Sequence, residues 1–309
     1  MRIVFMGTPE YSVRTLEALI KAGHSIEAVF AQPDKKVGRK QILTPPPVKV
    51  FASEHNIPVF QPERLKDNEE ILKALENINA DIIVVVAYGK ILPESILNMY
   101  KFGCINGHAS LLPKYRGASP IQWAIVNGEK QTGVTIMKMD RGMDTGDIIE
   151  STKIDIDDCD TADSLFEKLS IVSADLTVKV LKDISEEKAV FTKQDDSLAT
   201  YAPIIKKEMA HIDFNKPANE VRCAVRGYYS WPCAYFFLKN KRIKALSCAV
   251  ISGIKEEPGT VISTENGLAV ACKGGEGVLF DIIQPEGSKA MKSSDWLRGN
   301  KINPGEKVG

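Results

Sequence analysis

The chain has 309 residues, of which 44% are hydrophobic and 26% are charged, and its formal net charge is zero. These values are ordinary for a folded globular protein, so they exclude a disordered chain, and the length is enough for one large domain or two. The longest apolar run, residues 82–88, is far too short to span a bilayer, which excludes a helical membrane protein.

The charge is unevenly distributed along the chain. Residues 206–309 hold 16 Lys and Arg against 11 Asp and Glu, whereas residues 1–205 hold 24 against 29. A basic C-terminal module that binds a polyanion explains this asymmetry, and so does chance combined with solubility.

The six cysteines show no CxxC or Cys/His spacing of the kind that binds metal. The apolar run at the N-terminus is too short for the hydrophobic region of a secretory signal and is more typical of a first strand. We therefore expect reduced thiols, a cytoplasmic protein and no metal site.

Apolar runs and helical periodicities alternate along the first third of the chain. The pattern predicts strands and helices in this order: strand 2–7, helix 9–23, strand 25–32, helix 47–54, strand 57–60, helix 68–75, strand 80–89 and strand 101–110. Such an order is typical of an open, doubly wound and mostly parallel sheet, in which ligands bind beyond the carboxyl ends of the strands. Gly7 does not open a GxGxxG motif, so the fingerprint of a nicotinamide or flavin site is absent.

The stretch "QPDKKVGRKQILTPPP", residues 32–47, interrupts this alternation. It holds four basic residues between Lys35 and Lys40 and then three prolines, so it cannot be a helix or a strand throughout. We expect a long exposed loop on the same sheet edge as Gly7, and we favour contact with phosphate over a merely solvated loop.

The second half of the chain begins with a predicted hairpin at residues 131–156, whose turn reads "RGMDTG". An amphipathic helix at 161–184 follows, and then a polar, irregular stretch that is plausible as a linker. From residue 206 the texture changes to short alternating runs with turns every 8–12 residues or so, which predicts a small antiparallel barrel. A short helix near 293–297 completes it. The predicted domains are 1–189 and 207–309, joined by a linker at 190–206.

Asn106 and His108 stand two residues apart at the end of a predicted strand, so their side chains share one face. An amide and an imidazole together suit a developing oxyanion or a proton transfer at a carbonyl centre. Asp144 and Asp147 lie in the "GMDTGD" turn, where a carboxylate can fix the tautomer of an imidazole. A satisfied core histidine and aspartates that only bind turn amides explain the same residues.

The segments "CINGHASLLPKYRGASPIQWAI" (104–125) and "TGVTIMKMDRGMDTGDII" (132–149) resemble the folate-dependent formyltransferases, and within them those that act on methionyl-tRNA. The markers "GTPEYS", "QPDKKVGR", "TPPPVK", "VVVAYGKILP" and "WP" extend the resemblance over nearly the whole chain. The resemblance implies a Rossmann-like formyltransferase domain followed by a small OB-like barrel that supports tRNA. It also implies 10-formyltetrahydrofolate as co-substrate, initiator methionyl-tRNA as partner, no metal and a monomer.

The resemblance assigns roles to particular residues. It implies that Asn106, His108 and Asp144 catalyse transfer of the formyl group to the α-amine of the methionyl ester, and that Tyr11 lies near the methionyl side chain. The implied folate-binding residues are Val86, Ala87, Tyr88, Gly89, Ser110, Leu111, Leu112 and Pro113. The implied tRNA-binding residues are Lys35, Lys36, Arg39, Lys40, Lys206 and Lys207.

Two departures and two alternatives accompany this interpretation. Gly107 stands where the family pattern has a larger residue, and "GRKQIL" has fewer consecutive basic residues than the pattern. A formyltransferase acting on an amino-sugar nucleotide or another small amine would share the same catalytic residues. A non-catalytic module that binds folate or nucleic acid would not need all three of them.

Overall fold

A computed structural model describes residues 1–38 and 40–309. Contacts within the chain divide it into two compact units, which are described separately. Unit 1 contains Met1–Pro120, Gln131–Asp155 and Phe166–Ala202, and unit 2 contains Ile121–Lys130, Ile156–Leu165 and Pro203–Gly309. The domain limits predicted from the sequence, 1–189 and 207–309, remain predictions.

The central sheet of unit 1 has the strand order β5-β2-β1-β6-β7-β8-β9. Its strands are β1 (Arg2–Gly7), β2 (Ser25–Phe30), β5 (Val59–Phe60), β6 (Ile82–Val86), β7 (Cys104–His108), β8 (Gln131–Lys138) and β9 (Ile148–Asp155). Neighbouring strands from β5 to β7 pair in parallel, and β8 and β9 form the predicted antiparallel hairpin beside β7. The predicted mostly parallel sheet is therefore confirmed.

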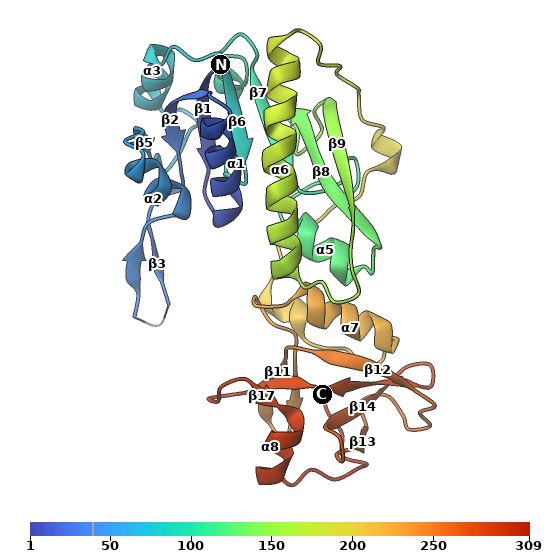
Figure 1. Cartoon of the computed structure of the whole chain (residues 1–309). Coiled ribbons are helices and arrows are strands. Elements are labelled where there is room, and N and C mark those ends of the chain that lie inside the picture. Colours follow the sequence, from blue (N-terminus) through green and yellow to red (C-terminus); the bar gives the residue numbers. More distant parts are fainter. Residues whose placement is uncertain (39) are drawn as a thin grey trace. The chain divides into compact units, whose positions relative to one another are not determined.

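Helices cover both faces of this sheet (Figure 1). They are α1 (Glu10–Lys21), α2 (Pro47–Glu54), α3 (Glu69–Asn77), α4 (Glu94–Leu97) and α6 (Ala162–Ser185), whose first turn belongs to unit 2. The helix α5 (Pro120–Val126) belongs to unit 2 apart from Pro120. Local chemistry sets some of their ends: a proline begins α2, and the side chain of Asn68 caps α3 by accepting a hydrogen bond from the Ile71 amide at 3.1 Å.

Apolar layers on the two faces explain why β6 is apolar throughout. On one face, Val4 and Ile83 join a core with Leu75 of α3 and Ile96 of α4. On the other face, Tyr11 of α1 packs edge-on against Phe166 of α6, with ring centroids 6.0 Å apart. Strands in the middle of the sheet thus have no solvent-facing side, and their carboxyl ends are the part left for a ligand.

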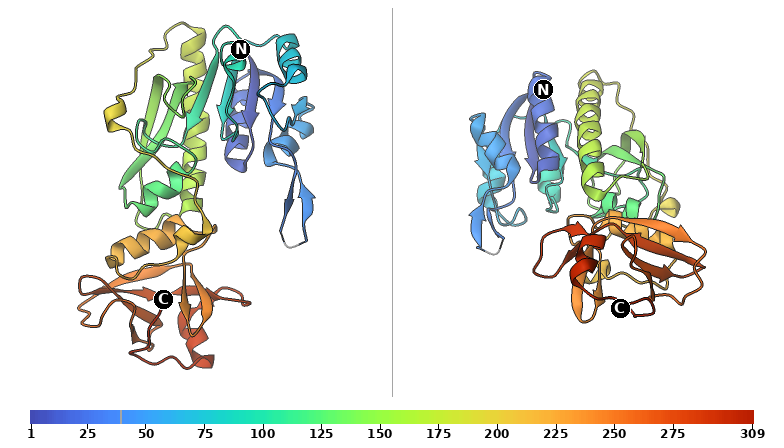
Figure 2. Two further views of the ribbon diagram at one scale, coloured as in Figure 1. Left: turned by 180° about the vertical axis from the view of Figure 1, so that it is seen from behind. Right: turned by 60° about the horizontal axis from the view of Figure 1, so that its bottom comes forward.

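The predicted loop at 32–47 is instead a short hairpin of β3 (Lys35–Val37) and β4 (Ile42–Thr44). The hairpin projects from the rest of unit 1 and every residue of its two strands is exposed (Figure 2). Because neither strand buries a face, the sequence carries no alternation of apolar and polar residues that would reveal it. The exposure that we predicted is present, and the stretch differs from the prediction in its two three-residue strands.

Unit 2 is rich in β structure, as expected. One sheet has the order β10-β11-β16-β17 and a second has the order β12-β15-β14-β13. Its strands are β10 (Tyr235–Leu238), β11 (Lys241–Ala245), β12 (Cys248–Ser252), β13 (Val261–Ser263), β14 (Leu268–Cys272), β15 (Glu276–Phe280), β16 (Ile282–Pro285) and β17 (Met291–Lys292). The remaining helices are η1 (Asp196–Leu198) in unit 1, and η2 (Lys207–Ala210), α7 (Ala218–Gly227) and α8 (Ser293–Gly299) in unit 2. Phe214, Phe236 and Phe280 lie in its core.

Candidate active site

The carboxyl end of β7 carries Asn106 and His108 on one face of the sheet of unit 1. Gly107 faces the other way, because a Cβ built on it would lie 3.0 Å from Oγ of Ser173 on α6. Asn106 pairs with Val85 of β6 and with Met137 of β8, so strands hold it on both sides. The side chains of Asn106 and His108 stand on a strand and not on a loop, so the strand fixes the direction in which each one points.

The imidazole ring of His108 is buried, with 7% of its surface exposed, and both ring nitrogens face oxygen atoms. Nε2 lies 2.9 Å from the carbonyl oxygen of Tyr115, and Nδ1 lies 3.6 Å from Oδ2 of Asp144. Both oxygens can only accept a proton in a hydrogen bond. The protein thus offers an acceptor to each nitrogen of the ring, one from the backbone and one from a carboxylate.

Asp144 is held in the turn between β8 and β9 by contacts to its side chain and its backbone. Its Oδ2 accepts a hydrogen bond from the amide of Gly117 at 2.8 Å. Its φ of +55° is in the left-handed region, which costs about 1 kcal/mol or more for a residue with a Cβ. The strained backbone aims the carboxylate at His108, and this arrangement is common where geometry serves function.

Asn106 has 9% of its surface exposed. Within residues 1–38 and 40–309, its side-chain amide has no hydrogen-bond partner. A nearly buried amide that is not engaged by the protein is available to a ligand. The structure thus brings His108 and Asp144 together, and it places Asn106 on the same face of the same strand as His108.

The two segments predicted to bind folate follow neighbouring parallel strands. After β6, Ala87 and Gly89 are exposed and have φ values of +46° and +77°. Tyr88 between them is buried, and burial raises the pKa of its hydroxyl to about 12. After β7, the Ser110 hydroxyl donates to the carbonyl of Lys114 at 2.6 Å. Along the rest of that segment Leu112 is buried, whereas Leu111 and Pro113 are half-buried.

The predicted tRNA-binding lysines are all exposed. Lys35 and Lys36 lie on β3 and Lys40 lies in the turn after it, whereas Arg39 lies outside the described residues. Lys206 and Lys207 lie at the start of η2 in unit 2. These positions suit contact with a polyanion, and they do not by themselves identify one.

Tyr11, predicted to lie near a methionyl side chain, is buried against α6. Its hydroxyl donates to the carbonyl oxygen of Leu169 at 3.3 Å, and burial raises the pKa of the hydroxyl. The assignment of Tyr11 to a methionyl pocket remains a prediction.

Sequence reasoning missed Gln194, which contacts the Asp144 turn, and Arg116, which contacts Gln194. Arg116 is buried, and its guanidinium donates to the side-chain oxygen of Gln194. The amide nitrogen of Gln194 donates to the carbonyls of Asp144 and Gly146. The "YRG" after "SLLPK" was the sequence signal for Arg116. An arginine that becomes buried next to a buried tyrosine needs hydrogen-bond acceptors for its guanidinium.

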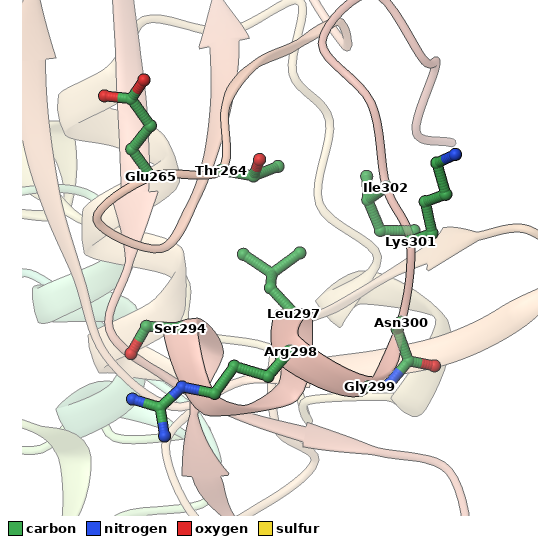
Figure 3. Close-up of a pocket in the computed structure, with 9 residues that line it drawn as sticks. All are labelled: Thr264, Glu265, Ser294, Leu297, Arg298, Gly299, Asn300, Lys301 and Ile302. Carbon is green, nitrogen blue, oxygen red and sulfur yellow. The ribbon is translucent and has the colours of Figure 1, made fainter.

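A separate open hollow lies in unit 2, between α8 and the loop after β13. Figure 3 shows Leu297 pointing into it. Arg298 at its edge lies 3.3 Å from Asp295, so that charge is already paired. The lining residues of this hollow include no pair of polar side chains like His108 and Asp144, and we assign no chemistry to the hollow.

In the part of the chain that the structure describes, no three His, Cys, Asp or Glu side chains form a group that could hold a metal ion. None of the described helices combines the length and apolarity that crossing a membrane requires.

Comparisons with known proteins match this architecture. The family model "Formyl transferase" matches residues 1–181, and "Formyl transferase, C-terminal domain" matches residues 204–301. The chain is 47% identical to the methionyl-tRNA formyltransferase of Lachnospira eligens, covering 100% of both chains. It is also 47% identical to that of Caldanaerobacter subterraneus subsp. tengcongensis, covering 99% of both.

Among solved structures, WlaRD, a sugar 3N-formyl transferase solved with 5-N-formyl-THF, superimposes with a TM-score of 0.70. That alignment covers 94% of this chain and 99% of the other at 22% identity, and it supports the fold alone. The resemblance that the sequence motifs indicated is confirmed by the two family models and the full-length relatives. The chain belongs to the formyl transferase family.

Proposed function

We propose that this protein transfers the formyl group of 10-formyltetrahydrofolate to the free α-amine of initiator methionyl-tRNA, which supplies N-formylmethionyl-tRNA for translation initiation. The observation that carries the proposal is the buried His108–Asp144 pair at the end of β7, in a chain that matches relatives of this activity over its full length. The alternative, formylation of an amino-sugar nucleotide, has no such support. The sugar formyltransferase WlaRD is only 22% identical to this chain, and that similarity supports the fold alone.

The reaction is an acyl transfer between two nitrogen atoms. The amine nitrogen of the methionyl ester forms a bond to the formyl carbon, and the carbonyl oxygen takes up the negative charge. The bond from that carbon to N10 of the folate then breaks, while one proton leaves the attacking amine and one reaches N10. The products are the formylated ester and tetrahydrofolate, so neither an oxidant nor a reductant is required.

Each of the three side chains has a part in this scheme. The Asn106 amide donates a hydrogen bond to the oxygen that becomes negative, and a single donor of this kind contributes about 10²–10³ in rate. The His108 imidazole stabilises the same charge and relays a proton between the two substrate nitrogens through Nε2, which exchanges its contact with the Tyr115 carbonyl for one with the substrate. The Asp144 carboxylate orients the ring and stabilises its protonated form from 3.6 Å.

The folate co-substrate fits the edge formed by the ends of β6 and β7. The exposed backbone at Ala87 and Gly89 offers peptide groups to a flat heterocycle, and neighbouring parallel strands end there together. A formyltransferase of the same fold was solved with a formylated folate, which supports a folate in this class of protein. We assign the contact residues to Val86–Gly89 and Ser110–Pro113.

The β3–β4 hairpin is the part of unit 1 that best suits a tRNA. It presents the charges of Lys35, Lys36 and Lys40 beside exposed Val37, Ile42 and Leu43. Lysines attract phosphates, and apolar side chains can pack on an opened base pair or an unpaired base. Lys206 and Lys207 would add further contacts to the phosphate backbone.

A substrate comparison tests the proposal. The full chain is given 10-formyltetrahydrofolate with charged initiator tRNA, charged elongator methionyl-tRNA or an amino-sugar nucleotide, and formylation is measured in a single turnover. We expect rapid formylation of the initiator substrate and no detectable reaction of the sugar nucleotide. Preference for the sugar nucleotide, or no transfer to any of them, would contradict the proposal.

We also propose that the protein acts in the cytoplasm, where charged tRNA is found, and that it acts as a monomer. Light scattering coupled to size-exclusion chromatography tests the second statement. A mass near 34.0 kDa is expected, and a mass of twice that value would contradict it.

A further inference from the structure

The segment from Thr192 to Ala202, here called the return segment, lies against the loop after β7 and against the Asp144 turn. It follows α6, and its backbone makes hydrogen bonds in two places within unit 1. Thr192 exchanges two hydrogen bonds of 2.8 Å with Ile148 at the start of β9. Arg116 pairs with Tyr201, through a hydrogen bond from its amide to the Thr200 carbonyl at 2.8 Å and one from the Ala202 amide to its carbonyl at 2.7 Å.

Gln194 of the return segment bridges the Asp144 turn and Arg116. Its side-chain nitrogen donates to the carbonyl of Asp144 at 2.9 Å and to that of Gly146 at 2.7 Å. Its side-chain oxygen accepts from Nε and from a terminal nitrogen of Arg116 at 3.1 and 2.8 Å. A primary amide offers two donors and one acceptor oxygen, and all of them are used here.

Arg116 explains why the bridge is held in place. Its side chain is 3% exposed, and a buried guanidinium is costly unless its donors are satisfied. Besides Gln194, it pairs with Asp196, whose Oδ1 lies 2.7 Å away and whose side chain is 82% exposed. Asp196 therefore balances the charge of Arg116. Because the buried guanidinium is held in place, it also fixes the position of Gln194.

One further contact to Asp144 comes from the loop that carries Arg116. Gly117, next to Arg116, donates to the Asp144 carboxylate at 2.8 Å. Its φ is +116°, and a Cβ there would lie 2.8 Å from the Ala202 carbonyl, so only glycine fits beside the return segment. Gln194 thus holds the backbone of Asp144, and Gly117 holds its side chain.

We propose that Gln194 and Arg116 are positioning residues, which hold the strained Asp144 turn so that its carboxylate faces His108. The proposal rests on the proposed function, in which Asp144 is the partner of a catalytic imidazole. Without the two donors of Gln194, the left-handed Asp144 loses the contacts to its carbonyl, and its carboxylate no longer has a fixed distance to the ring.

Two variants of the full chain separate positioning from folding. Gln194→Ala removes the whole bridge. Gln194→Glu keeps oxygen acceptors for Arg116 but removes both donors and sets a negative charge against two carbonyls. We expect kcat to fall about 10-fold or more in both, with KM for each substrate changed less than about 3-fold. Gln194→Glu should melt within a few degrees of the parent, because its carboxylate still pairs with Arg116.

The pH dependence identifies the route of the effect. In Gln194→Ala the pH profile of kcat should shift in the same direction as in Asp144→Asn, since both weaken the same imidazole–carboxylate pair without adding a charge. The matched control is Gln131→Ala, which removes an exposed glutamine of β8 that bonds to Asp155 at 2.8 Å, and its profile should equal that of the parent. A folded Gln194→Ala variant with the parent's kcat and pH profile, or a Gln194→Glu variant with the parent's kcat, would overturn the proposal.

A second measurement needs no substrate. The His108 ring signal of isotope-labelled protein, assigned with His108→Gln, is followed by NMR through a pH titration. We expect its titration to move in Gln194→Ala in the same direction as in Asp144→Asn, and to stay unchanged in Gln131→Ala. If the ring titrates identically in the parent and in Gln194→Ala, the positioning role is wrong even if formylation is found. If the ring signal moves but no formylation occurs, the proposed function fails and the positioning role stands.

Discussion

The end of β7 and the β3–β4 hairpin both belong to unit 1, and they differ in exposure and in proposed role. His108 is 7% exposed and both of its nitrogens face fixed acceptors, whereas every residue of the two hairpin strands is exposed. The first region excludes water and holds its dipoles in place before the substrate arrives, as stabilisation of developing charge requires. The second presents charge and apolar surface to a large partner. Chemistry and recognition can therefore be disturbed separately.

The largest effect is expected from removing the catalytic side chains. Asn106→Ala, His108→Ala and Asp144→Ala should each lower single-turnover formylation about 10²–10³-fold, because each removes a group that acts on the developing charge. Binding of charged tRNA, measured by filter retention, should change little because the hairpin is intact. Full activity in all three variants would remove the basis of the comparison.

The next largest effect is expected at the hairpin. Lys35→Ala/Lys36→Ala should raise KM for methionyl-tRNA about 10-fold near 0.15 M salt, with kcat unchanged, because each lost phosphate contact weakens binding without touching the reaction. The salt dependence of KM should become shallower at the same time. Lys66→Ala/Lys73→Ala, on exposed lysines elsewhere in unit 1, is the matched control. Equal effects of the two pairs would mean that the hairpin is not a specific contact.

A smaller effect is expected at the base of the hairpin. Asp34 accepts hydrogen bonds from Gln61 at 2.7 Å and from Lys49 at 2.9 Å, and these contacts hold the pKa of its carboxyl below the ordinary value. Asp34→Asn should raise KM for tRNA only about 2- to 5-fold, because an ion pair that solvent screens contributes little to the orientation of the hairpin.

The sign of the Asp34 shift also predicts a pH response. A lowered pKa means that the contact stabilises the fold above the pKa of the unfolded chain, about 4, and is lost only as the pH falls through the lower folded value. The difference in KM between the parent and Asp34→Asn should therefore be constant from pH 6 to pH 8. A difference that fades within this range would show that another group sets the hairpin's orientation.

The smallest effect is expected at Gly107, on the α6 face of β7. A glycine within a strand costs about 0.5–1 kcal/mol relative to alanine, but a Cβ here would lie 3.0 Å from Oγ of Ser173. Gly107→Ala should therefore be nearly neutral alone, and it should stabilise by about 0.5–1 kcal/mol in a Ser173→Ala background. Urea midpoints of the four chains give the coupling, and its absence would mean that Ser173 does not limit the space. Activity should be unchanged in all four.

These regions also differ in how far the sequence revealed them. The strands of unit 1 and the pairing of Asn106 with His108 on one face follow from apolar runs and a two-residue period, which are local signals. The hairpin was missed as a hairpin because it buries neither face. Gln194 was placed in a linker because its partners Asp144 and Gly146 lie 50 and 48 residues away in the sequence. The polar segment around it also has no periodicity that would predict such contacts.

The return segment has a consequence for dissecting the protein. A truncated chain ending at residue 189 would lack Gln194 and Thr200, and it would leave the buried Arg116 guanidinium without either of its side-chain partners. Limited proteolysis or cloning intended to yield the first module alone should therefore keep the chain through Ala202, the last residue that unit 1 contains. A shorter fragment would lose activity through a damaged catalytic turn, and that loss would be mistaken for a requirement for unit 2.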